Sequence, residues 1–145
     1  MALWKSARLP HGFTHVWSQE LRSLAELSRL RIRLRTELTG SPTVIHPERE
    51  HWSERLVLVV DEIASNGLRH GGLPVAATLA RKGDAWLIAV SDNSPEPPTP
   101  AEGRDPGLGG FGLYLVADLA VQHGWCAERR AKTVWAIVRA TPSEG

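Results

Sequence analysis

The stretch Leu56–Gly71, LVLVVDEIASNGLRHG, decides the fold, because its pattern predicts an amphipathic helix closed by a glycine. At about 100° per residue, one face of this helix collects the residues that a core would bury. They are Leu56, Val59, Val60, Ile63 and Gly67. Glu62 and Asn66 lie one turn apart at the edge of this face, whereas Asp61 and Ser65 point to the opposite side.

The pair formed by Glu62 and Asn66 is a candidate for chemistry. A carboxylate and a carboxamide beside a core are costly unless polar groups meet them. Glu62 could act as a general base, and Asn66 could offer an oxygen to Mg²⁺, which prefers a few protein oxygens together with substrate phosphates. The alternative is an exposed helix flank, because Glu-x-x-x-Asn is a common pattern.

Length and composition indicate a single globular domain over residues 1–145, with 42% hydrophobic residues to form a core. The formal net charge of +1 gives no argument for nucleic acid or membrane as a partner. The single cysteine, Cys126, excludes an intramolecular disulfide and a zinc cluster built on thiolates. Residues 1–13 lack the apolar centre of a signal peptide and are expected to be irregular and partly disordered. We therefore expect a cytoplasmic protein.

Ahead of the central stretch, leucines recurring every three or four residues predict a helix from Ser18 to Leu38, after a short extended piece at Thr14–Trp17. Thr39–Pro42 would end this helix. The same helix carries five arginines, which form either a solvated face or a partner-binding or membrane-surface face. They are Arg22, Arg29, Arg31, Arg33 and Arg35. A helix that begins near Pro47 is expected to continue into the central stretch.

After the central stretch, the apolar runs Val75–Ala80 and Ala85–Ser91 predict a β-hairpin, whose second run is a central strand. Phe111–His123 is expected to be a second amphipathic helix, and Trp125–Glu128 and Thr133–Arg139 a second hairpin.

These elements predict an α+β fold, a two-layer sandwich in which a mixed, mostly antiparallel sheet carries helices on one face. The covering helices would contain Leu24–Leu34, Val59–Ile63 and Leu115–Leu119, because each has a one-sided apolar pattern.

The segment Gly107–Gly112 matches the dinucleotide fingerprint G-x-G-x-x-G, with Glu128 sixteen residues further on. That fingerprint needs a strand immediately before it, and here a loop with five prolines precedes it. A Walker loop is absent because no Gly-Lys-Ser/Thr follows. The glycines can still expose N–H groups to phosphate at the start of a helix, or they can simply belong to a lid with a helix cap.

Four features in this order resemble the GHKL ATPase superfamily, which includes gyrase, histidine kinases and MutL. They are the N box Glu62–Asn66, Asp92 at the end of a strand, the glycine box Gly110–Leu113, and Thr133 in the last strand. The resemblance covers about residues 14–140 and is greatest to the small anti-sigma-factor serine kinases of the RsbW and SpoIIAB type. It implies the Bergerat ATP-binding fold, with ATP and Mg²⁺ as cofactors.

The resemblance also implies roles for single residues. Glu62 would be the general base, Asn66 the Mg²⁺ ligand, and Asp92 the acceptor for the adenine amino group. The nucleotide would also be bound by the glycine box and by residues on either side of it. These are Arg104 in the ATP lid (residues 93–110), Gly110, Gly112, Leu113 and Thr133.

One departure from the family concerns its first glycine box, Asp-x-Gly-x-Gly. Here it reads Asp92-Asn93-Ser94-Pro95-Glu96, so side chains replace hydrogen at both glycine positions.

The leading hypothesis is an anti-sigma factor that is also a serine protein kinase, with an anti-anti-sigma (STAS-type) protein as its substrate. A sigma factor would be its other partner, and a homodimer is compatible with this assignment. No direct contact with nucleic acid or membrane is expected. One alternative is a degenerate GHKL-fold module that regulates by contact alone. A weaker alternative is a dinucleotide-binding oxidoreductase.

Overall fold

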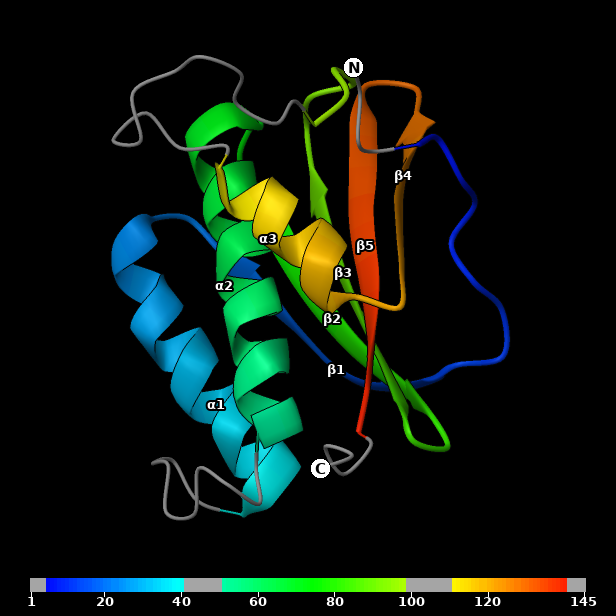
Figure 1. Ribbon diagram of the computed structural model, residues 1–145. Helices are drawn as coiled ribbons and strands as arrows, with labels where there is room; N and C mark the ends of the chain where they lie inside the picture. The colour runs from blue at the N-terminus through cyan, green and yellow to red at the C-terminus, as the bar shows by residue number, and fades with distance from the viewer. Residues whose placement is uncertain (1–4, 41–50, 99–110, 141–145) are drawn as a thin grey trace.

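The computed structural model describes residues 5–40, 51–98 and 111–140, which form two layers (Figure 1). The strands are β1 (Thr14–Leu21), β2 (Val75–Lys82), β3 (Ala85–Asp92), β4 (Gln122–Glu128) and β5 (Ala131–Arg139). The helices are α1 (Leu27–Thr39), preceded by the 3-10 turn η1 (Leu24–Glu26), α2 (His51–His70) and α3 (Phe111–Leu119). The sheet order is β1-β2-β3-β5-β4, and all neighbouring strands are antiparallel. The predicted two-layer α+β arrangement is confirmed, but the five described strands form a wholly antiparallel sheet and not a mixed one.

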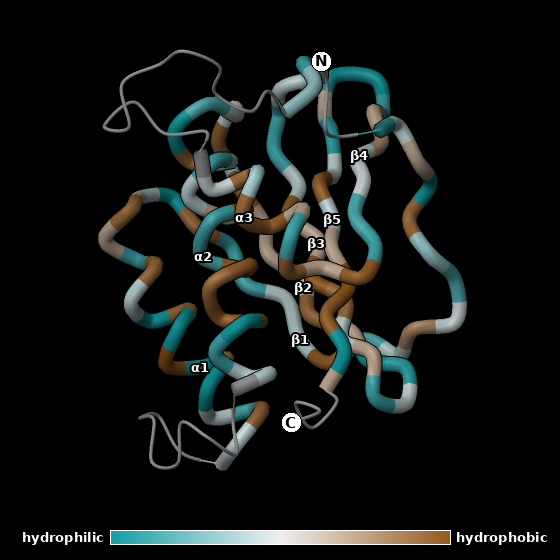
Figure 2. The backbone as a smooth tube through the Cα atoms, in the orientation of Figure 1, coloured by the Kyte–Doolittle hydropathy of each residue, from teal (hydrophilic) through white to brown (hydrophobic). Residues whose placement is uncertain are grey.

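Helix α2 is the element that joins the two layers. It contacts α1 and α3 on either side and packs on β2, β3 and β5. Leu56, Val59, Val60 and Ile63 are each at most 1% exposed, as the amphipathic pattern predicts. Their neighbours in the same core come from the helix-facing side of the sheet, and Figure 2 shows hydrophobic segments of both layers meeting there. The core therefore lies between α2 and the central strands.

The helix predicted from Ser18 to Leu38 is wrong at its beginning. Residues up to Leu21 belong to β1, which pairs with β2, and α1 begins only at Leu27. Trp17 and Leu21 are both buried in the core. Residues four apart share a face in a strand as well as in a helix, so the leucine spacing could not separate the two structures.

The helix predicted from Phe111 to His123 is too long. It ends at Leu119, and β4 begins at Gln122, which pairs with Ile137 of β5. His123 likewise pairs with Ala136. The strand begins here because these residues complete the ladder with β5, which the local apolar pattern does not show.

The sheet face that carries no helices has a smaller apolar cluster. Its buried members are Ala80, Leu87, Ala89, Trp135 and Ile137. Ala7 and Phe13 of the N-terminal segment pack against this cluster, and Ser6 forms an isolated parallel bridge with Trp125 of β4. None of the described helices has the length and apolarity that crossing a membrane requires.

Candidate functional site

The predicted site residues that the structure describes gather mainly at one end of the sandwich. There the C-terminal half of α2, the end of β3, the start of α3 and the start of β5 meet, in the upper part of Figure 1. Two glycines approach acidic side chains closely at this end, Gly112 beside Glu62 and Gly71 beside Asp92.

Gly112, in the first turn of α3, lies directly against the carboxylate of Glu62. A Cβ atom at position 112 would overlap Oε2 and Cδ of Glu62, so the carboxylate of Glu62 occupies the space that a side chain at this position would need. The N–H groups in the first turn of a helix have no partner within that helix. The carboxylate of Glu62 and the anion-favouring end of α3 therefore share one small region.

Glu62 is half-buried, and burial raises its pKa above the ordinary value of 4.5. The negative charge of Asp61 raises this pKa further, and the positive charge of Arg69 lowers it. Asp61 itself forms an ion pair with Arg31 of α1. No hydrogen bond or ion pair joins the Glu62 carboxylate to a described residue. A carboxylate with a raised pKa and no partner has the properties of a proton acceptor.

Asn66 follows Glu62 by one turn and is half-buried. Gly67 beside it is buried, and a Cβ atom there would lie 3.4 Å from Val90 and 3.5 Å from Val75. This turn of α2 therefore packs on β2 and β3 at ordinary van der Waals distance. Within residues 5–40, 51–98 and 111–140, no group of three or more His, Cys, Asp or Glu side chains could hold a metal ion. A Mg²⁺ ion at Asn66 would therefore depend on phosphate oxygens for its other ligands.

Asp92 ends β3 on the helix-facing side and is 2% exposed. Gly71, just after α2, lies against its carboxylate, and a Cβ atom there would overlap Asp92 Cγ and Oδ2. The Ser94 N–H donates to Oδ1 at 2.8 Å. Lys132 Nζ lies 3.1 Å from Oδ1 and 3.0 Å from Oδ2, which makes a buried ion pair. The family resemblance did not single out Lys132.

Thr133 does not join the other predicted residues. It pairs with Ser91 and Cys126, whereas its neighbour Lys132 pairs with Asp92. Because side chains alternate along a strand, Thr133 lies on the helix-free side of the sheet. Its predicted contact with adenine therefore lacks support, and Lys132 occupies the corresponding place. The sequence carries no signal for this, because Val134–Val138 is apolar throughout and buried on both faces, so it does not alternate.

The remaining predicted residues are Arg104, Gly110 and Leu113, together with the predicted lid. Arg104 and Gly110 lie outside the described residues, as does most of the predicted lid. Leu113 is 1% exposed and belongs to the main core. At the start of the predicted lid, Asn93 is fixed to the loop after α2, because its N–H donates to the Gly72 carbonyl at 2.8 Å.

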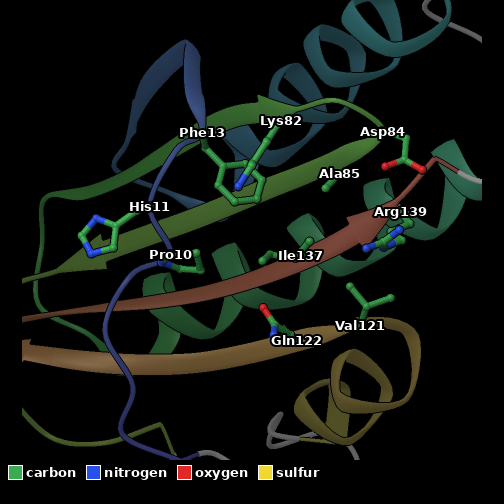
Figure 3. Close-up of a pocket in the computed structure, with 10 residues that line it drawn as sticks. All are labelled: Pro10, His11, Phe13, Lys82, Asp84, Ala85, Val121, Gln122, Ile137 and Arg139. Carbon is green, nitrogen blue, oxygen red and sulfur yellow. The ribbon is translucent and has the colours of Figure 1, made fainter.

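A separate hollow of about 590 Å³ opens on the helix-free face, far from these residues in the fold. Figure 3 shows His11 at one end of it and Arg139 at the other, with Lys82 and Phe13 between them. It contains none of the predicted site residues.

No protein-family model matches the chain, and no curated protein is significantly similar to it. The arrangement of the residues therefore carries the functional argument.

Proposed function

We propose that this chain is a GHKL-type ATP-binding domain that acts as an anti-sigma factor and as a serine protein kinase. A sigma factor and an anti-anti-sigma protein of the STAS type would be its partners, with the second as the substrate. ATP and Mg²⁺ are the proposed cofactors, the Bergerat fold is the proposed fold type, and the cytoplasm is the proposed location.

The observation that carries this proposal is the contact between Glu62 and Gly112. It brings a half-buried carboxylate with a raised pKa to the start of a helix, where N–H groups favour phosphate. Asn66 lies one turn further along α2, and its carboxamide oxygen could bind a Mg²⁺ ion.

The proposed reaction transfers the terminal phosphoryl group of ATP to a serine. The serine oxygen of the substrate protein forms a bond to the terminal phosphorus of ATP while the bond to ADP breaks. Glu62 accepts the serine proton, and its raised pKa suits that task. Such transfers depend mainly on positioning and on neutralised charge, which a helix N-terminus and Asn66 with Mg²⁺ would supply.

A second candidate is a regulatory module of the same fold that binds partners without ATP turnover. Ser94 and Glu96 occupy the places of the two family glycines, and Thr133 faces away from Asp92. Each of these features removes a contact that a nucleotide would otherwise use.

Isothermal titration of the whole chain tests the proposal. We expect Mg-ATP and Mg-ADP to bind and NADH not to bind. Asn66→Ala should weaken the Mg²⁺-dependent part of ATP binding, whereas Ser65→Ala, one residue away, should leave it unchanged. Binding of NADH without ATP would exclude the proposal. Binding of neither nucleotide, with normal partner binding, would favour the second candidate.

A further inference from the structure

The ion pair between Asp92 and Lys132 ends an otherwise apolar ladder. The preceding cross-strand pairs of β3 and β5 on the helix-facing side are Val90–Val134, Ile88–Ala136 and Trp86–Val138. At the next pair both residues are charged, yet only 1% of the Asp92 side chain and 5% of the Lys132 side chain are exposed. A buried ion pair is often no more stabilising than an apolar pair of similar volume. Stability alone therefore gives no reason for charges at this position.

The hydrogen-bond capacity of this pair is not fully used. An ammonium has three donors, and Lys132 Nζ contacts the two Asp92 oxygens and the Ser94 carbonyl. The contact with Ser94 is the longest, at 3.4 Å, beyond the usual range for such a bond. Asp92 Oδ2 contacts only Lys132 among the described polar groups. The pair thus presents a weakly used donor beside an acceptor with a free lone pair.

We infer that Lys132 is a specificity-determining residue, which donates to N1 of adenine while Asp92 accepts from the 6-amino group. This inference rests on the proposed ATP-binding function. Adenine presents an acceptor, N1, directly beside a donor, the amino group. A donor and an acceptor held 3.0 Å apart on neighbouring strands match that order. The N–H that now points to Ser94 is the one available for N1.

The wild-type protein tests this inference without any substitution. We compare Mg-ATP with Mg-1-deaza-ATP, in which a C–H replaces N1, by isothermal titration. Loss of a hydrogen bond to a charged donor should weaken binding by about 10–100-fold. Purine riboside triphosphate, which keeps N1 but lacks the amino group, tests Asp92 in the same way. Equal affinity for ATP and 1-deaza-ATP overturns the role of Lys132, because a merely structural lysine would not distinguish them.

Substitutions test whether the preference for ATP over 1-deaza-ATP depends on Lys132. Lys132→Met should bind ATP and 1-deaza-ATP equally well. Since this change leaves a buried carboxylate unpaired, the double variant Asp92→Asn with Lys132→Met provides a neutral version of the pair. Lys82→Met removes an exposed lysine from β2 and should keep the wild-type preference.

The outcomes separate the two proposals. Wild-type protein that binds ATP and 1-deaza-ATP alike overturns the role of Lys132 and leaves ATP binding intact. Wild-type protein that binds neither nucleotide overturns both. A Lys132→Met protein that folds and still prefers ATP also overturns the role of Lys132.

Discussion

The two halves of α2 differ in whether their polar and aromatic side chains have partners. In the first half, Trp52 stacks on Trp86 with ring centroids 6.3 Å apart, and Glu54 accepts two hydrogen bonds from Arg35, each 3.0 Å long. In the second half, Glu62 has no described partner and its pKa is raised, and glycines replace larger side chains where α2 meets its neighbours. Trp52 and Glu54 in the first half thus have defined partners. In the second half, the Glu62 carboxylate has none among the described residues.

The largest expected effect is on phosphoryl transfer, and it distinguishes Glu62 from its neighbour Asp61 in the second half of α2. Glu62→Gln keeps the size of the side chain but removes the base, so phosphoryl transfer should fall by about 10²–10⁴-fold while ATP still binds. Asp61→Asn, which breaks the ion pair with Arg31, should keep most of the transfer activity. Labelled-phosphate transfer to the proposed anti-anti-sigma substrate measures both. Equal losses in the two variants would show that Glu62 has no special role.

Leu56→Ala examines the first half of α2. Leu56 is fully buried, so its truncation should lower the free energy of unfolding by about 2–5 kcal/mol. Leu58, 39% exposed on the same helix, is the control, and Leu58→Ala should change that free energy by less than about 0.5 kcal/mol. Urea denaturation gives both values. Nucleotide affinity of the folded Leu56→Ala protein should equal that of the wild type.

Gly112→Ala examines the close approach between α2 and α3. The added methyl group meets the carboxylate of Glu62, a flexible side chain that has to turn aside, and should cost about 0.5–1.5 kcal/mol of stability. In a Glu62→Ala background that obstacle is gone, and the higher helix propensity of alanine should stabilise the protein by up to about 1 kcal/mol. A double-mutant cycle by urea denaturation measures this reversal of sign. The same small loss in both backgrounds would argue against the contact.

The smallest effect concerns pH. Because the pKa of Glu62 is higher in the folded state, the folded protein binds more protons than the unfolded chain above about pH 4.5. The contribution of Glu62 to stability is therefore fully present below that pH and is lost as the pH rises through the folded pKa. The stability of Glu62→Gln relative to the wild type should accordingly increase with pH. Ser65→Ala, a substitution without a titratable group, should show no such trend.

Much of the fold could be predicted from local pattern. The apolar period of α2 and the two hairpins are correct, because helical periodicity and apolar runs joined by a short polar turn are both local signals. At Trp17 and Leu21 the spacing of apolar residues did not distinguish a helix from a strand, because residues four apart share a face in both. The end of α3 could not be predicted, because Gln122 joins β4 only through its pairing with β5.

The candidate site shows the same division. The residues Glu62 and Asn66 follow from their spacing on one helix, but the contact with Gly112 joins residues fifty positions apart. The side of the sheet on which Thr133 lies depends on the register of β5 against β3. A shift of one residue would exchange Thr133 and Lys132, so the motif alone could not choose between them.

The sequence by itself determined which elements form and which of their faces are apolar, because secondary structure and burial follow from side-chain periodicity over a few turns or rungs. It also determined the polar pair on α2. Only the tertiary structure decided that Glu62 meets Gly112 and that Asp92 pairs with Lys132. These contacts depend on strand register and on how closely two backbones approach, and both are set by packing among segments distant in the chain.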